Sequence, residues 1–228
     1  MTKVAVLDDY QEVALEMADW KSLPSGTEVT VFKNHLSDEC DVSKRLAEFE
    51  VVSAMRERTP FPKRLLENLP NLKLLVTTGM RNASIDVPAA SKLGITVCGT
   101  EGLGYPTAEL TWGLIVSLAR KISEENSSSR SGSWQTTLGI GLNGKKLGIL
   151  GLGNLGAQVA RIGNAFGMNV VSWSQNLTKS KAAENEVTLV SFDELMESSD
   201  FLSIHTVLSD RTRNLIGRRE LNLMKPSA

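Results

Sequence analysis

Lys145-Lys-Leu-Gly-Ile-Leu-Gly-Leu-Gly-Asn-Leu-Gly156 is the stretch that decides the fold of this chain. Residues 147–150 suit a short buried strand, Gly151-x-Gly153-x-x-Gly156 follows, and residues 155–166 repeat apolar side chains at the helical period. We expect Gly151 to make a tight turn, Gly153 to let the backbone approach a pyrophosphate, and Gly156 to let the helix pack on the strand. The first amides of the helix would then face the phosphates.

A second match to the same pattern, Gly139-x-Gly141-x-x-Gly144, lies just upstream. A lysine pair and a strand follow it, so it offers no helix start to hold a phosphate. The segment also resembles a P-loop, but Lys146 stands where that motif needs Ser or Thr, and no strand precedes it. We therefore interpret Asn143-Gly144 as a turn.

The composition excludes several classes of function. The 228 residues include 25 basic and 26 acidic side chains without a sizeable basic run, so nucleic acid is not an expected partner. Cys40 and Cys98 lie far apart and suit free thiols in a reducing compartment, and no His/Cys cluster has metal-ligand spacing. The N-terminus lacks a signal-peptide core, and the most apolar stretch, 110–122, is too short to span a bilayer. We expect a cytoplasmic protein with no membrane and no metal.

Residues 1–100 are expected to form one domain in which strands alternate with helices. Strands are expected at 4–7, 28–32, 51–54, 73–76 and 95–97, and helices around 13–20, 42–49, from Pro62 and from Asp86 to Gly94. Repeated βα units predict a parallel sheet with helices on both faces. His35 lies in a polar segment of this half and is expected to be solvated.

Residues 101–228 are expected to form a second domain, entered through a hinge or linker at 99–106. A helix over 107–124 is apolar on nearly every side, which indicates burial between domains or in a subunit interface. The serine-rich segment 127–133 is expected to be a loop. Further strands are expected at 169–173, 187–190 and 201–204, and helices at 193–196 and 218–224. The strand at 201–204 would form an exposed sheet edge.

Four further segments, 78–86, 106–111, 142–153 and 204–216, accompany the glycine motif. Together they resemble the D-isomer-specific 2-hydroxyacid dehydrogenases over essentially the whole chain. The resemblance implies an α/β protein: a flavodoxin-like substrate domain followed by a Rossmann, doubly wound, dinucleotide-binding domain that is incomplete. It also implies hydride transfer between NAD or NADP and a small 2-oxo or 2-hydroxy acid, and a homodimer in the full-length form.

The resemblance also implies roles for individual residues. The coenzyme would contact Gly151, Gly153, Asn154, Leu155, Gly156, Ser174, Gln175, Asn176, His205, Thr206, Val207 and Thr212. The substrate carboxylate would be held by the loop from Arg56 to Thr59 and by the amides of Met80, Arg81 and Asn82. Two alternatives stay open from the residues themselves: residues 56–58 as a merely solvated loop, and His205 as a loop histidine that caps local backbone.

Ser174 departs from the pattern of NAD-specific relatives, which place an acid there for the ribose hydroxyls. A carboxylate would repel a 2′-phosphate, so serine makes NADP tolerable. Gln175, Asn176, Lys179 and Lys181 offer donors nearby, although no arginine follows directly. We therefore expect use of NADP(H), or of both coenzymes.

The family's catalytic arginine, glutamate and histidine would all follow Pro226, so no catalytic residue is assigned within this chain. We interpret the chain as a truncated product or fragment and expect it to be inactive alone. One alternative is a dinucleotide-sensing protein, like the transcriptional corepressors that share this fold, and another is an inactive nucleotide binder. A corepressor should capture a peptide when its coenzyme is bound, whereas a dehydrogenase should consume NAD(P)H.

Overall fold

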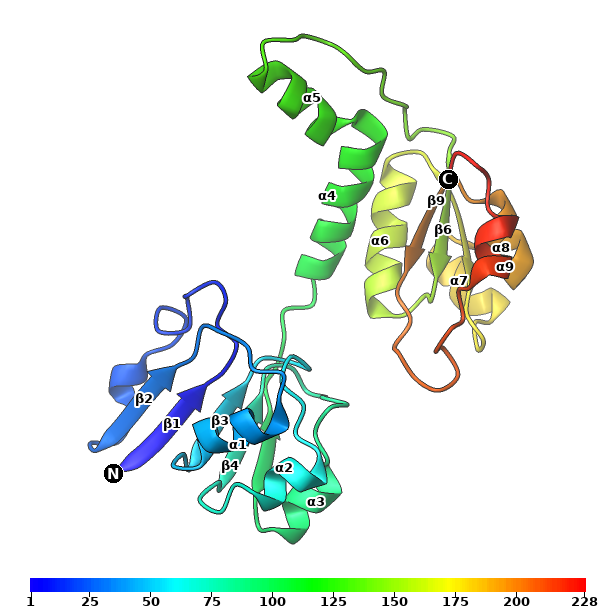
Figure 1. Cartoon of the computed structure of the whole chain (residues 1–228). Helices are drawn as coiled ribbons and strands as arrows, with labels where there is room; N and C mark the ends of the chain where they lie inside the picture. Colours follow the sequence, from blue (N-terminus) through cyan, green and yellow to red (C-terminus); the bar gives the residue numbers. More distant parts are fainter. The chain divides into compact units, whose positions relative to one another are not determined.

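A computed structural model describes all residues from 1 to 228 and divides them into two compact units, Met1–Gly102 and Leu103–Ala228 (Figure 1). Each unit is built on one parallel sheet. No helix in either unit combines the length and apolarity that a membrane crossing requires.

The sheet of the first unit contains five parallel strands in the order β2-β1-β3-β4-β5. This is the strand order of flavodoxin-like doubly wound sheets, so the predicted fold of this half is confirmed. The order reverses between β1 and β3, which places a crevice at the carboxyl ends of these two strands. The strands are β1 (Thr2–Val6), β2 (Thr27–Val31), β3 (Val51–Ala54), β4 (Leu74–Thr77) and β5 (Thr96–Gly99).

Three helices, α1 (Glu39–Leu46), α2 (Lys63–Glu67) and α3 (Val87–Lys92), pack on one face of this sheet. Their apolar side chains enclose Ala5, Val52 and Leu75. These three residues point into the core because alternate residues of a strand face the same side of the sheet. The start of α3 is as predicted, because the Asp86 carboxylate accepts from the Ala89 amide at 3.0 Å.

The helix predicted between residues 13 and 20 does not form. Turns replace it, followed by the short 3-10 helix η1 (Trp20–Ser22). The Asp9 carboxylate accepts from the amides of Val13 (3.1 Å) and Ala14 (2.9 Å). A helix that began here would leave these two amides without intrahelical acceptors in any case, so the Asp9 bonds do not compete with it. The competing bond is made by the Trp20 indole, which donates at 2.7 Å to the Ala14 carbonyl, the acceptor that the Ala18 amide would need in a helix.

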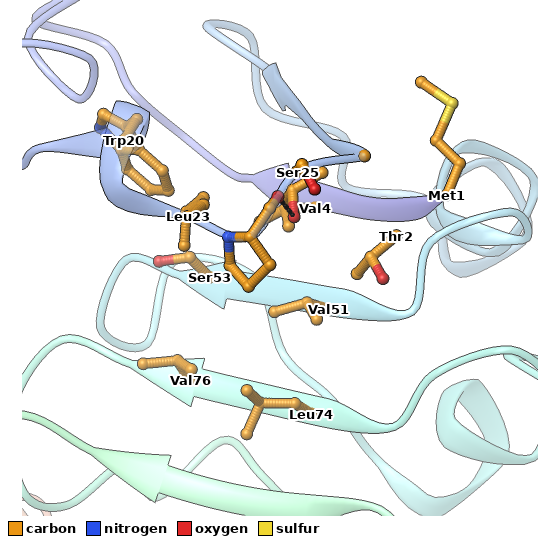
Figure 2. A pocket seen from close by; sticks show the side chains of 13 residues that line it. Met1, Thr2, Val4, Trp20, Leu23, Ser25, Val51, Ser53, Leu74 and Val76 are labelled. Carbon is orange, nitrogen blue, oxygen red and sulfur yellow. Dashed lines mark hydrogen bonds between the residues drawn. The ribbon is translucent and has the colours of Figure 1, made fainter.

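Because that helix is missing, the second face of the sheet carries no α-helix, and the prediction of helices on both faces is wrong for this unit. Figure 2 shows the resulting apolar groove, in which Trp20 and Leu23 lie near Val4, Val51 and Val76. The groove has a volume of about 470 Å³, and no ionisable side chain lines it. Besides the Trp20 indole, its polar side chains are hydroxyls only, so it offers no charged side chain to bind an anionic substrate.

The sheet of the second unit contains four parallel strands in the order β8-β7-β6-β9. In chain order this is the 3-2-1-4 arrangement of the first four strands of a Rossmann sheet, which confirms the predicted fold. The strand β9 lies at the sheet edge, as expected. The strands are β6 (Lys146–Leu150), β7 (Asn169–Trp173), β8 (Thr188–Leu189) and β9 (Phe201–Ile204).

Helices cover both faces of the second sheet. On one face α4 (Pro106–Arg120) and α6 (Asn154–Ala165) enclose a core around Leu147 and Ile149. On the other, Leu150 and Val171 pack against α8 (Phe192–Ser198) and α9 (Arg218–Leu223). The remaining helices of this unit are α5 (Ile122–Arg130) and α7 (Lys179–Glu184).

The helix predicted over 107–124 is divided at Lys121, whose left-handed φ of 56° ends α4 and begins α5. Only one face of α4 is buried in this chain. Trp112 belongs to that face and stacks on Phe166, with 4.9 Å between ring centroids. The opposite face exposes leucines at four-residue spacing.

The loop predicted over 127–133 is wrong for its first half, because α5 continues to Arg130. The Ser127 hydroxyl donates to the Ser123 carbonyl at 3.0 Å, so this serine bonds within the helix instead of ending it. The Glu125 carboxylate also accepts from the Thr137 amide at 2.6 Å and ties the helix to the segment that follows.

Candidate functional site

The carboxyl ends of β6, β7 and β9 lie side by side at one edge of the second sheet. The Gly151 amide donates to the Trp173 carbonyl at 2.9 Å, and the His205 amide donates to the Leu150 carbonyl at 2.8 Å. The strand order reverses between β6 and β9. In doubly wound sheets a ligand binds in the crevice at that position.

Glycines shape the turn that leaves β6. Gly151 has a φ of +100°, and a Cβ there would lie 3.0 Å from the His205 backbone and from Thr206 Cγ2. A Cβ on Gly156 would overlap the Gly151 carbonyl oxygen, so this glycine lets α6 pack directly on the strand. Both mechanical roles agree with the sequence prediction. Gly153 differs from them because a Cβ there would meet no heavy atom within 4 Å, so the space beside it is open.

The start of α6 presents free amides beside this open space. Gly153 is the N-cap residue, no side chain caps the helix, and its first turn carries no acidic side chain. The Ala157 amide donates to the Gly153 carbonyl at 2.9 Å, whereas the amides of Asn154, Leu155 and Gly156 have no acceptor within the chain. Three free donors at the positive end of a helix dipole fit the charge and size of a diphosphate.

The upstream glycine pattern is a turn, as predicted. Gly144 has a φ of +74°, and the Lys145 amide donates to the Leu142 carbonyl at 3.0 Å. The strand β6 follows immediately, so no helix start faces this segment.

Ser174 follows the last residue of β7 and is half-buried, and Gln175 and Asn176 are exposed in the turn after it. No carboxylate occurs between residues 174 and 181. The Lys181 ammonium is paired with Glu184 at 3.1 Å, whereas Lys179 forms no ion pair. The end of β7 is therefore polar and carries no negative charge.

The segment after β9 supplies the other predicted coenzyme contacts. His205 Nε2 lies 2.8 Å from the Ser203 hydroxyl, and burial lowers the pKa of His205. The histidine thus bonds a side chain here, and not the local backbone that the alternative interpretation expected. The Thr212 hydroxyl donates to the Val207 carbonyl at 2.6 Å and closes the loop. Thr206 and Thr212 line a pocket of about 320 Å³ at this end of the sheet.

In the first unit, the predicted substrate residues lie on two loops that hydrogen bonds tie together. Asn82 Nδ2 donates to the Arg56 carbonyl at 2.6 Å, and the Arg56 amide donates to the Thr78 hydroxyl at 3.1 Å. Met80, Arg81 and Asn82 line a pocket of about 360 Å³. The Arg56 side chain is exposed, but its backbone is held, so this segment is more than a solvated loop.

Sequence reasoning missed a buried carboxylate at the end of β1. Asp8 is 2% exposed, and its two oxygens bond His35 (3.0 Å) and Thr59 (2.7 Å). His35 is exposed, as predicted, and its Nδ1 in addition bonds the buried Asp8 carboxylate. The signal was present in the sequence, because two aspartates directly follow a buried strand, where parallel sheets place ligands.

No group of three or more His, Cys, Asp or Glu side chains is arranged to hold a metal ion. At the candidate site of the second unit, the polar groups are backbone amides, hydroxyls and His205. The polar chemistry of the first unit lies in arginines, amides and the Asp8 carboxylate.

Comparison with known proteins gives the same picture. Residues 112–228 match the profile of the D-isomer-specific 2-hydroxyacid dehydrogenase NAD-binding domain. A glyoxylate reductase from Aeropyrum pernix is 41% identical over 174 residues, which cover 72% of this chain and 52% of that protein. A D-3-phosphoglycerate dehydrogenase from Methanocaldococcus jannaschii is 33% identical over 100% of this chain and 43% of its own length. The chain thus spans about half the length of these two relatives.

Among solved structures, a phosphoglycerate oxidoreductase from Vibrio cholerae superposes with a TM-score of 0.91 at 38% identity, covering 99% of this chain and 73% of that one. The match includes the first unit, which lies outside the profile of the NAD-binding domain. With its glycine turn, its strand order and these similarities, the chain belongs to the D-isomer-specific 2-hydroxyacid dehydrogenase family.

Proposed function

We propose that the second unit binds a nicotinamide dinucleotide at the start of α6, and that the protein uses it for hydride transfer with a small 2-oxo or 2-hydroxy acid. The observation that carries the proposal is the set of free amides at Asn154, Leu155 and Gly156, which face the open space beside Gly153. The coenzyme supplies the hydride, and the chain supplies binding, orientation and charge.

The residues present fit this coenzyme. The amides at the start of α6 would hold its diphosphate, and Ser174 with its two neighbours would face a ribose. His205, Thr206, Val207 and Thr212 would line the opposite side, because Gly151 brings the first two of them against the turn. Backbone amides can stabilise an anionic ligand in this way, and the protein need not bury a cationic side chain to do so.

The absence of a carboxylate after β7 supports NADP(H) as the coenzyme, or use of both forms. Ser174 leaves room for a 2′-phosphate, and Lys179 is a nearby cation that no acid neutralises. Titration with NADH and NADPH by calorimetry tests this part. Binding of NADH about tenfold tighter than NADPH, or more, would contradict it.

On the substrate side, the first unit would hold a carboxylate with the Arg56 side chain and the amides of residues 80–82. The names of the relatives, glyoxylate reductase and D-3-phosphoglycerate dehydrogenase, support a small 2-oxo acid as the substrate class. For residues 1–228 alone we expect binding without turnover, because no acid–base pair is assigned among them. Measurable reduction of glyoxylate would show that a proton donor is present after all.

We also propose that a second copy covers the exposed face of α4. Leu110, Leu114 and Leu118 are 65%, 57% and 67% exposed and form one ridge at four-residue spacing. Light scattering coupled to gel filtration should give the mass of a dimer. Leu114→Glu should give a monomer, because a charge in the centre of an apolar contact would be desolvated without a partner.

The coenzyme site is tested with a glycine that the fold does not need. Gly153→Ala adds a methyl group that meets no protein atom within 4 Å, but it occupies the space where a diphosphate would approach. Calorimetry should show the Kd for NADH or NADPH raised by about tenfold or more. Gly141→Ala is the matched control, because its Cβ also meets nothing within 4 Å. Equal affinities in wild type and Gly153→Ala would overturn the placement of the coenzyme.

A further inference from the structure

The first unit contains a buried carboxylate that the proposed function does not use. Asp8 directly follows the buried residue Leu7 at the end of the β1 segment and has a left-handed φ of 57°, which is strained for a residue with a side chain. Both of its carboxylate oxygens have partners: Oδ1 lies 3.0 Å from His35 Nδ1, and Oδ2 accepts from the Thr59 hydroxyl at 2.7 Å. A buried charge of this kind persists only when such partners are present.

The three residues of this cluster come from three different loops. Asp8 follows β1, His35 follows β2, and Thr59 belongs to the segment after β3. These strands are neighbours in the sheet, so their carboxyl ends meet at the crevice where the strand order reverses. The Asp8 carboxylate therefore joins the three loops that border this crevice.

The loop after β3 is held at both of its ends. Towards β4, the Arg56 amide and carbonyl bond Thr78 and Asn82, as described above. Towards β1, Thr59 bonds the Asp8 carboxylate, and Arg58 Nη1 donates to the Asp8 carbonyl at 2.6 Å. The Arg58 guanidinium also lies 4.4 Å from the centre of the Tyr10 ring, which fixes it further.

Arg56 itself forms the anchor towards β4 and has a left-handed φ of 52°. A non-glycine residue keeps this conformation only where its surroundings determine it. Its guanidinium lies against Gly79, whose Cβ position it would overlap, and so it faces the loop that carries Met80, Arg81 and Asn82. The direction of the Arg56 side chain thus depends on both anchors.

We propose that Asp8 is a positioning residue: through Thr59 it holds the 55–59 loop so that Arg56 points at the loop of residues 79–82 and can meet a substrate carboxylate there. The inference rests on the proposed function, because it assumes that these two loops hold the carboxylate of a 2-oxo acid. Asp8 itself does not touch the substrate.

The test uses the full 228-residue chain and compares four variants by amide hydrogen exchange and by titration with glyoxylate. Thr59→Val removes the hydroxyl and keeps the side-chain shape, and Thr59→Ser keeps the hydroxyl. Asp8→Asn removes the charge. Thr27→Val is the matched control, because Thr27 donates to Pro24 at 2.8 Å in the same unit but away from these loops.

We expect Thr59→Val and Asp8→Asn to speed exchange of the Arg56 and Arg58 amides about tenfold and to raise the Kd for glyoxylate by a similar factor. Thr59→Ser should restore both values, Thr27→Val should change neither, and all four variants should bind NADPH like the wild type. Rescue by serine separates positioning from a general loss of structure. Asp8→Asn is a buried substitution that risks misfolding, so the valine and serine pair decides the case.

Two results would overturn the inference. The first is unchanged exchange in the 55–59 loop of Thr59→Val. The second is faster exchange with an unchanged Kd for glyoxylate, which would make Asp8 a structural residue only. If the wild-type chain does not bind glyoxylate, the substrate half of the proposed function fails and takes the positioning role with it, while the exchange data still report whether Asp8 holds the loop.

Discussion

The two sheets of this protein reverse their strand order at equivalent places, but the residues at the two reversal points differ: one carries a carboxylate and the other carries free backbone amides. In the first unit the reversal lies between β1 and β3, and in the second it lies between β6 and β9. Two aspartates follow the first-unit strand β1 and its neighbour Leu7, whereas glycines follow β6. One crevice is filled by a carboxylate with its own partners, and the other is left open and lined with free amides.

This difference shows that topology sets where a ligand can bind and that the residues after the strand decide whether it does. At the end of β1, Asp8 is bonded on both oxygens and offers no hydrogen-bond donor to an anion. At the end of β6, the small size of Gly151, Gly153 and Gly156 exposes the positive end of α6. An anionic coenzyme is therefore favoured in the second unit and disfavoured at the equivalent place in the first.

The largest change in stability is expected at Gly156, where α6 packs closely on the turn that forms the open crevice. Gly156→Ala places a Cβ on the Gly151 carbonyl oxygen, so backbone must move. We expect a loss of about 1–3 kcal/mol in the free energy of unfolding of the second unit, together with loss of NADPH binding. Urea unfolding, with the β6 amide signals reporting on this unit, measures it. Gly113→Ala, in a helix and with no neighbour within 4 Å, should be neutral or stabilising. Equal results for the two variants would contradict the packing argument.

A carboxylate introduced into the open crevice should change coenzyme choice. Ser174→Asp would place a negative charge after β7, where a 2′-phosphate would lie. We expect the Kd for NADPH to rise about tenfold, a change of about 1.4 kcal/mol, with a much smaller change for NADH. Calorimetry with both coenzymes measures the ratio, and Ser174→Asn is the uncharged control. A parallel loss for NADH and NADPH would mean that the side chain blocks the site in general.

The second unit does use a carboxylate, but at the amino end of its strands. Asp200 accepts from the Lys146 amide (2.7 Å) and from the Lys225 ammonium (2.6 Å). Burial alone would raise the pKa of Asp200, but these two donors outweigh it and lower the pKa below the ordinary 3.8.

A lowered pKa in the folded state means that the bonds of Asp200 stabilise the protein above the ordinary pKa and are lost as the pH falls below it. We expect Asp200→Asn to cost about 1 kcal/mol near neutral pH, in keeping with a partly exposed charged hydrogen bond. The difference from wild type should shrink in acid. Urea unfolding over a pH series checks this, and a difference that does not depend on pH would contradict it.

The smallest effect concerns His205, the histidine of the open crevice. Burial lowers its pKa below the ordinary 6.5, so the ring should be neutral at neutral pH. Because the unfolded chain binds this proton more readily, the second unit should lose a little stability as the pH falls below 6.5. Titration of the ring signals by NMR, assigned with His205→Gln, measures the midpoint. A midpoint at or above 6.5 would show that burial is not the controlling influence.

The local features of the fold were predictable because neighbouring residues specify them. The apolar run at 147–150, the glycine spacing and the following periodic helix are all contained within about one βα unit. The cap at Asp86 and the turn at Gly144 follow from single residues in the same way. The helix expected at 13–20 failed where the Trp20 indole occupies the Ala14 carbonyl, a competition that apolar periodicity does not register.

By itself the amino-acid sequence determined the alternation of strands and helices in the two domains, the glycine turn and the family to which they point, since these depend on short-range patterns. Only the tertiary structure showed that Asp8 meets His35 and Thr59, which lie 27 and 51 residues away. It also showed that one face of α4 stays exposed while the other is buried. Contacts of this kind depend on which strands become neighbours in the sheet, and a linear pattern of apolar and polar residues does not encode that order.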